Sequence, residues 1–236
     1  MPPRGTQAPQ RNVDVLLGTL TLSGKRVLDV GCGDGALARL MAGHGAQVTG
    51  IECSPRQLAK AHAAPPAEGA TVVEGVAQAL PAADGSVDVV VFFNSLHHVP
   101  AEFMDKALAE AARALVPGGV LFVSEPLAEG DFFQLVRSVD DETDVRAKAY
   151  AALQAVERHG LRMEEEFVNL HPMRFDGLDG VRERIVSANA ERERLFAEKE
   201  GELTVAFLHL GVADGTGRLF LQPTRINILR KLESVK

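Results

Sequence analysis

Short apolar runs alternate with amphipathic segments along the first half of the chain. Such runs have the length and the β-branched content of buried strands, whereas the segments between them space their apolar residues as one face of a helix does. Five runs are predicted to be strands: residues 27–30, 48–52, 71–73, 87–93 and 120–124. Strands that alternate with helices predict a parallel α/β sheet with right-handed crossovers.

Helix boundaries are marked by local signals. Ser54 followed by Pro55 is typical of a helix start, so residues 55–63 are predicted to form a helix. A short helix that would lie over the ligand is expected at residues 13–20, after a start (residues 1–10) rich in Pro, Gly and Gln that we expect to be mobile.

The second half of the chain carries weaker patterns. An amphipathic helix is predicted at 141–158, closed by Gly160. Strands are predicted at 167–171 and 218–231, with helical structure over 178–212 between them.

Three alternating glycines, Gly31, Gly33 and Gly35, follow the first predicted strand. Glycine lets the backbone adopt positive φ and lets a ligand approach with no Cβ in the way. The next residues, 36–41, form an apolar helical face, so the unit is strand, glycine turn and helix, with the positive helix end at the turn. Two cofactor classes use such a unit, because the spacing also satisfies the looser dinucleotide fingerprint.

Acidic residues at the ends of the first two strands bear on this choice. Asp29 suits a ligand that carries an ammonium and a sulfonium better than one that carries a pyrophosphate, which favours S-adenosylmethionine. Glu52 is placed to accept hydrogen bonds from two ribose hydroxyls, and it would do so with either cofactor.

Four stretches in order resemble the class I S-adenosylmethionine-dependent methyltransferases, over approximately residues 24–126. They are the glycine turn and residues 80–91, 94–99 and 109–119. The third resembles the strand-end motif of the small-molecule branch, which includes ubiquinone and menaquinone methyltransferases. The resemblance implies a Rossmann-like, doubly wound sheet of seven strands, mostly parallel with an antiparallel last strand. It also implies S-adenosylmethionine as the cofactor and S-adenosylhomocysteine as the product.

One position departs from the family pattern. Val76 stands where an aspartate commonly bonds the adenine amino group, which leaves adenine to backbone groups near Ala77, to Gln78 or to apolar stacking. The predicted cofactor-binding residues are Asp29, Gly31, Cys32, Gly33, Gly35, Glu52, Cys53, Ala77, Gln78, Asn94 and Ser95.

His97 and His98 are the candidate catalytic residues. They would lie at one crevice with Asp29, Glu52, Asn94, Ser95 and Glu125, because ligands in open α/β sheets bind beyond the carboxyl ends of the strands. A methyl acceptor usually has to lose a proton, and histidine titrates near neutral pH. The alternative is structural: one imidazole packs in the turn and the other touches solvent or caps the next helix.

Other side chains are weaker candidates. The leaving group of methyl transfer is a neutral thioether, so we expect no metal. Four residues from the later part of the chain could point into the substrate pocket: His171, His209, Tyr150 and Arg174. The alternative is that each of them is structural.

Composition narrows the function classes. The formal net charge of −7, with no strongly basic block, argues against nucleic acid as a partner. No window approaches the roughly 20 apolar residues that span a bilayer, and the chain start has no apolar signal core, so we expect a cytoplasmic protein without a membrane span. Cys32 and Cys53 show no metal-binding spacing and are predicted to be reduced thiols, with a disulfide or redox role as the alternative.

A single domain is predicted over residues 1–236. Residues 1–23 would form an arm and a helix, 24–126 the cofactor-binding core and 127–236 the part that selects the substrate, with a helical lid at about 178–212. A charge run in this lid (residues 182–194) is interpreted as a solvated helix face rather than a binding patch. Seven phenylalanines in this half line either an apolar pocket or an ordinary core: Phe132, Phe133, Phe167, Phe175, Phe196, Phe207 and Phe220.

The expected function is methyl transfer to a small-molecule acceptor, phenolic or quinone-like by hypothesis, with the acceptor atom (oxygen, carbon or nitrogen) left open. Two alternatives remain: a protein that binds S-adenosylmethionine without turnover, and an NAD-dependent oxidoreductase, which rests on the glycine spacing with Glu52.

Overall fold

The computed structural model describes residues 8–188 and 191–233. Their strands are β1 (Arg26–Val30), β2 (Gln47–Glu52), β3 (Ala70–Glu74), β4 (Val87–Phe93), β5 (Leu115–Pro126), β6 (Leu161–Phe175), β7 (Val212–Asp214) and β8 (Gly217–Lys231). Each strand predicted in the first half is present, and β4 has the predicted bounds. Among the later strands, β8 begins one residue before its predicted start and ends where predicted, whereas β6 is three times as long as the five-residue run that predicted it.

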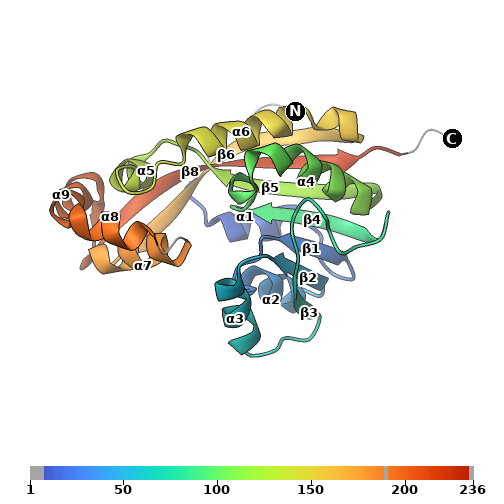
Figure 1. Ribbon diagram of the computed structural model, residues 1–236, viewed down its shortest axis with the longest axis horizontal. Helices are drawn as coiled ribbons and strands as arrows, with labels where there is room; N and C mark the ends of the chain where they lie inside the picture. The colour runs from blue at the N-terminus through green and yellow to red at the C-terminus, as the bar shows by residue number, and fades with distance from the viewer. Residues whose placement is uncertain (1–7, 189–190, 234–236) are drawn as a thin grey trace.

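The strands form one sheet in the order β3-β2-β1-β4-β5-β8-β6, and β7 pairs with β8 (Figure 1). The first five strands are parallel to their neighbours, whereas β8 is antiparallel to both β5 and β6. The prediction of a mostly parallel sheet with an antiparallel last strand is confirmed. The sheet has eight strands rather than seven, because the short β7 returns from the lid and pairs with the start of β8.

The helices among the described residues follow the predicted alternation. They are α1 (Asn12–Thr19), α2 (Ala36–Gly43), α3 (Pro55–Ala63), α4 (Ala101–Ala114), α5 (Asp131–Val136), α6 (Thr143–Gln154), α7 (Leu178–Ala188), α8 (Arg192–Glu198) and α9 (Glu200–Leu210), with 3₁₀ turns at Leu96–His98 and Val156–His159. Among these helices, none has the length and apolar character needed to cross a membrane.

Two apolar cores cover the two faces of the sheet. Alternate residues of one strand point to opposite faces, so Val90 and Phe92 join the core beneath α4 and α6, while Val89 and Val91 join the core beneath α1 and α2. Burial on both faces explains why these strands read as continuous apolar runs. The result is a doubly wound sheet, with α4 and α6 together over one face (Figure 1).

A third core lies at the end of the molecule where α5, α7, α8 and α9 gather around the start of β8 (Figure 1). The rings of Phe132 and Phe175 stack at 5.5 Å, and Phe207 and Phe220 also have ring centroids 5.5 Å apart. Phe196 is buried in the same core, whereas Phe133 and Phe167 pack elsewhere. The core interpretation therefore holds for most of these phenylalanines, although Phe132 also lines the cavity beside this core.

The start of the described chain is tied to the sheet edge. Residues 1–7, most of the arm predicted to be mobile, lie outside the described residues, and the backbone N–H of Gln10 donates to the Leu170 carbonyl at 3.1 Å. In α1, the Asn12 amide donates to Thr224 Oγ1 at 3.1 Å. This anchors α1 against β6 and β8.

Candidate functional site

Two adjoining cavities lie beyond the carboxyl ends of the parallel strands. The first, called here the strand-end cavity, has a volume of about 530 Å³ and is lined by residues between Val30 and Pro100. The second, the lid cavity, has about 280 Å³ and is lined by residues from α1, α5, α7, β6 and β8 as well as by His97. Gln57, Asn94 and His98 line both cavities. A separate cavity of about 550 Å³ at the amino ends of β1 and β2 contains none of the predicted site residues.

The glycine turn forms one wall of the strand-end cavity. Gly33 has a φ of 57°, and a Cβ added there would meet no atom within 4 Å. The turn is therefore open to a ligand at this residue. Gly31 and Gly35 have a second reason to be glycine, because a Cβ would come within 2.6 Å of Ser95 Cβ and within 2.9 Å of Val72 Cγ2, respectively.

Glu52 is held at the end of β2 by backbone donors. Its carboxylate accepts hydrogen bonds from the backbone N–H groups of Gly33 (2.8 Å), Cys53 (2.9 Å) and Ser54 (2.8 Å). A carboxylate oxygen can accept more than one hydrogen bond. Glu52 is thus fixed in the cavity wall with acceptor capacity left for a ligand.

Asp29 lies behind this wall rather than in it. Its side chain is buried, and Oδ2 has no hydrogen-bond partner within the described protein. Burial, helped by the charge of Glu52, raises the pKa of Asp29 to about 7. A buried, unpartnered carboxylate is costly in a strand unless a positive group compensates it.

The structure separates the predicted cofactor residues into two groups. Eight of them line the strand-end cavity: Gly31, Gly33, Glu52, Cys53, Ala77, Gln78, Asn94 and Ser95. The other three, Asp29, Cys32 and Gly35, do not line it. Both cysteines are free thiols, and burial raises the pKa of Cys32 to about 12.

Asn94 marks the junction of the two cavities. Among the described residues it is the one non-glycine with positive φ, at 55°. Its backbone N–H donates to the Ser124 carbonyl at 2.7 Å, which extends the pairing of β4 and β5 by one residue. Strained backbone of this kind gathers at functional sites, although asparagine tolerates it better than most residues.

A histidine–carboxylate pair stands at the same strand ends. His97 is buried, and its Nδ1 forms a hydrogen bond with Glu125 Oε2. The other oxygen of Glu125 accepts from the backbone N–H groups of Leu96 (2.9 Å) and Ser95 (3.2 Å). With Nδ1 bonded to Glu125, Nε2 is the ring nitrogen beside the lid cavity, and it presents a lone pair there whenever the ring is neutral.

The two neighbouring imidazoles have opposite pKa shifts. Burial lowers the pKa of His97, but Glu125 and Glu142 outweigh it, so its pKa lies above the ordinary value. For His98, loss of hydration and the adjacent His97 lower the pKa to about 4, although the side chain is exposed toward the cavities. His98 is therefore neutral at pH 7.

Several polar residues of the lid cavity were missed by sequence reasoning. Glu142 at the start of α6 forms ion pairs with Arg146 (2.7 Å) and Arg192 (3.1 Å). Nothing in the local sequence distinguishes Glu142 from other surface acids. Arg184 and Arg192 belong to the charge run predicted to be a solvated face, and both line this cavity. Arg184 is exposed, as a solvated face requires, whereas Arg192 is partly buried and ion-paired with Asp140 and Glu142, so that interpretation is wrong for Arg192.

Of the four weaker candidates from the second half of the chain, one lines the lid cavity and three do not. His171 lines the lid cavity and accepts at Nδ1 from the Asn12 backbone N–H (3.2 Å). His209 is exposed on α9, Tyr150 lines a different cavity, and Arg174 pairs with Asp176 at the surface. The helix α1 contributes Asn12 to the lid cavity and nothing to the strand-end cavity, so it does not cover the expected cofactor position.

Comparisons with known proteins show what the chain is similar to. Residues 28–123 match the model of a family described as "Methyltransferase domain". A curated relative, the ubiquinone biosynthesis O-methyltransferase of Paraburkholderia xenovorans (strain LB400), is 45% identical over 107 residues, which are 44% of this chain and 45% of the relative. The match thus spans about half the length of that relative.

Two solved structures resemble the fold over most of its length. The YcgJ protein from Bacillus subtilis has a TM-score of 0.66 at 19% identity, covering 94% of this chain and 98% of that one. The [4+2]-cyclase SpnF has a TM-score of 0.62 at 20% identity, covering 94% of this chain and 80% of that one. Identities this low establish the shared fold alone. Together with the match over residues 28–123, they agree with the resemblance seen in the sequence: the fold is that of the class I S-adenosylmethionine-dependent methyltransferases, and the first half of the chain is similar to the methyltransferase domain family.

Proposed function

We propose that the protein transfers a methyl group from S-adenosylmethionine to a small-molecule acceptor. The observation that carries the proposal is the junction of the two cavities at Asn94 and His98, beside the His97–Glu125 pair. In this arrangement the strand-end cavity holds the donor and the lid cavity holds the acceptor. When bound, the donor supplies an electrophilic methyl group on a sulfonium.

The residues of the strand-end cavity fit this cofactor. Gly33 leaves open space where a Cβ would stand, and Glu52 is oriented by three backbone donors as a partner for ribose hydroxyls. The unpartnered Oδ2 of Asp29 would be compensated by a positively charged ligand in front of it. A volume of about 530 Å³ lies within the usual range of small-molecule sites.

Because Val76 has no polar side chain, other groups would have to bind the adenine ring. Its side chain is 39% exposed and lines the strand-end cavity together with Ala77 and Gln78. Ile51 and Val99 are in the same wall. This supports apolar contacts to the adenine ring, with the Gln78 side chain as a polar partner.

His97 is the better of the two candidate bases. Nε2 faces the lid cavity, and Glu125 both fixes the tautomer and stabilises the protonated ring that forms after proton removal. His98 has a pKa of about 4, so it is a weaker base, and its position against both cavities fits contact with donor and acceptor.

The acceptor proposed is a small hydroxylated molecule. Polar residues line the lid cavity, including Asn12, Gln222 and Thr224 as well as the histidines, and apolar side chains share its wall, so it suits a ligand that has both hydroxyl groups and apolar surface. The O-methyltransferase name of the relatives supports oxygen as the acceptor atom. A phenolic or quinol-like ring stays within this proposal.

Calorimetric titration with S-adenosylmethionine and S-adenosylhomocysteine, with NADH as the control ligand, tests the donor site. We expect saturable binding of the first two and none of NADH, followed by methylation in a screen of phenolic and other hydroxylated acceptors. Binding without turnover of any acceptor would favour the non-catalytic alternative. Binding of NADH that S-adenosylhomocysteine does not displace would favour the oxidoreductase.

A further inference from the structure

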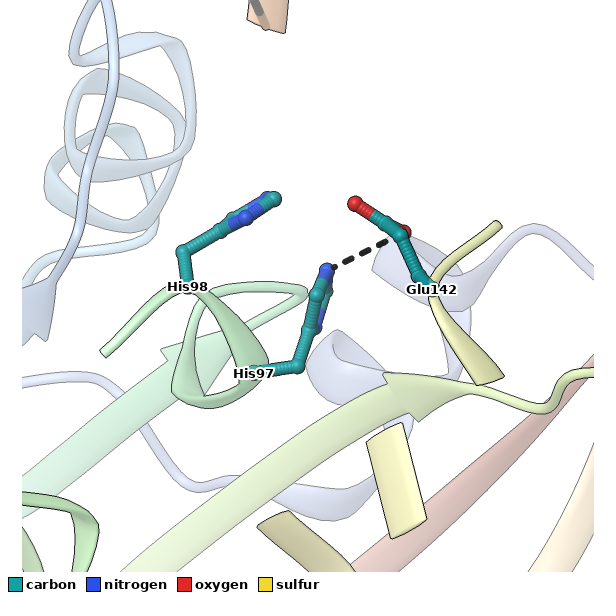
Figure 2. A group of neighbouring side chains, drawn as sticks. All are labelled: His97, His98 and Glu142. Carbon is teal, nitrogen blue, oxygen red and sulfur yellow. Dashed lines mark ion pairs between the residues drawn. The ribbon is translucent and has the colours of Figure 1, made fainter. Parts of the chain in front are cut away.

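Three potential metal ligands converge at the mouth of the lid cavity. Figure 2 shows the rings of His97 and His98 and the carboxylate of Glu142 pointing toward a common space. One ligand atom from each lies within 4.8 Å of the others, and the distance from His97 Nε2 to Glu142 Oε2 is 3.6 Å. The 3₁₀ turn after β4 supplies both imidazoles, whereas Glu142 comes from the start of α6.

The spacing is close to what a small ion requires. A tetrahedral Zn²⁺ with ligand bonds of 2.0–2.1 Å places its ligand atoms about 3.4 Å apart. The His97–Glu142 distance nearly meets this value as it stands. One ring nitrogen of His98 lies within 4.8 Å of the other two ligand atoms. Because His98 is exposed, its side chain has room to rotate toward them.

Residues behind the ligands hold them in the required state. Metal-bound histidines commonly donate the other ring N–H to a carboxylate, and Glu125 accepts from His97 Nδ1 in this way. Nε2 of His97 is then directed at the shared space with its lone pair free.

Charge in this cluster also permits a cation. Burial raises the pKa of Glu142, but His97 and Arg146 outweigh it, so the pKa lies below the ordinary value and the group is ionised. Glu125, Asp140 and Glu142 together oppose the two guanidinium groups of Arg146 and Arg192. The arginine contacts fix the orientation of the Glu142 carboxylate.

We propose that His97, His98 and Glu142 bind a divalent first-row transition ion of the Zn²⁺ class. Two imidazoles and one carboxylate are a common ligand set for such ions, and they leave coordination positions open to water or substrate. Mg²⁺ is disfavoured because it prefers oxygen ligands.

With the ion bound, His97 Nε2 would be a ligand and no longer a base; the open positions of the ion, beside the lid cavity, would instead hold an acceptor oxygen and favour its ionised form. This role of the ion rests on the proposed methyl transfer, whereas the binding of the ion does not. Methyl transfer needs no metal at the leaving group, so the ion would act on the acceptor alone.

Metal titration of the intact protein tests the site. Zn²⁺ affinity is measured by competition with a chromophoric chelator, and Co²⁺ is added to separate samples to record its visible absorption, which reports coordination geometry. We expect one ion per chain and a Co²⁺ spectrum typical of nitrogen and oxygen ligands in a site of low coordination number.

Two variants and one matched control make the assignment specific. His98→Ala and Glu142→Gln should each weaken Zn²⁺ binding by about 100-fold or more, because each loses one of three protein ligands. His209→Ala removes an exposed histidine on α9 and should bind Zn²⁺ as the unchanged protein does. Circular dichroism and thermal melting confirm that each variant is folded.

The outcomes separate this inference from the proposed function. The same samples are titrated with S-adenosylhomocysteine. Absence of Zn²⁺ binding, or equal affinity in the protein and in folded His98→Ala and Glu142→Gln, would overturn the metal site whatever the cofactor result. Zn²⁺ binding without S-adenosylhomocysteine binding would support the metal site and count against the proposed methyl transfer.

Discussion

The strand-end cavity and the lid cavity lie side by side, yet they are built in different ways. The strand-end cavity is formed within 71 consecutive residues, Val30 to Pro100, and the backbone of the glycine turn is part of its wall. The lid cavity joins residues as distant as Asn12 and Thr224, and ion-paired side chains line it. The difference shows that the proposed donor site is encoded locally, whereas the proposed acceptor site depends on how the two halves of the chain pack.

The two cavities also differ in how their polar groups are held. Glu52 is fixed by amides of its own turn and of the neighbouring glycine turn, so its position follows from the strand ends themselves. Glu142 is held by Arg192, which belongs to a helix fifty residues further along the chain. A small shift of the lid helices would therefore move Glu142 and leave Glu52 in place.

The largest expected effect comes from His97→Ala. Loss of a general base typically lowers turnover by about 10²–10⁴-fold, while the affinity for S-adenosylhomocysteine should change little because His97 does not line the strand-end cavity. The measurement is turnover with an acceptor found in the screen, beside a titration of the cofactor. His98→Ala should lower turnover less. Unchanged activity in both variants would favour the alternative that the two histidines are structural.

Gly33 gives the matching test of the strand-end cavity. Gly33→Val should abolish cofactor binding while largely preserving the fold, because the side chain would occupy open space in the cavity. Since φ is positive here, Gly33→Ala serves as a milder variant, with an expected loss of affinity of about 100-fold, or about 2.7 kcal/mol. Gly18→Ala, at a helical position with no atom within 4 Å of the added Cβ, is the control. Retained affinity in folded variants would refute this role for Gly33.

The smallest expected effect is the pH dependence that Asp29 imposes. Its pKa in the ligand-free protein is about 7, above the ordinary value of 3.8, so its contribution to stability is present below about pH 4 and is lost as pH rises through 7. A positively charged ligand favours the carboxylate, so S-adenosylmethionine should bind roughly three- to tenfold more tightly at pH 8 than at pH 6.

Calorimetry at several pH values, in buffers of different ionisation enthalpy, measures the affinity and the released proton. The neutral thioether of S-adenosylhomocysteine should give a weaker dependence. Asp29→Asn should bind with little pH dependence, and at pH 8 without ligand it should melt at a higher temperature than the unchanged protein. A pH dependence that persists in this variant would assign the proton to another group.

Much of the fold could be predicted because its signals are local. The β4 and α3 bounds coincide with the prediction, since an apolar run and a Ser-Pro start depend on neighbouring residues only. The long β6 could not be found in this way, because many of its outward residues are polar or charged and the strand is formed by pairing with β8 over fourteen positions. The lid phenylalanines were ambiguous for a similar reason: only packing decides between a core and a pocket.

The sequence by itself determined the parallel core, the glycine turn and the candidate positions of Glu52, Asn94 and the two histidines. Strand ends and turns fix these residues through short-range geometry, so a linear pattern suffices to find them. Only the tertiary structure decided that Glu142 faces His97, that Glu125 holds the other side of that ring, and that the lid residues form a cavity. Those contacts join elements far apart in the chain, and their positions depend on packing that no local pattern records.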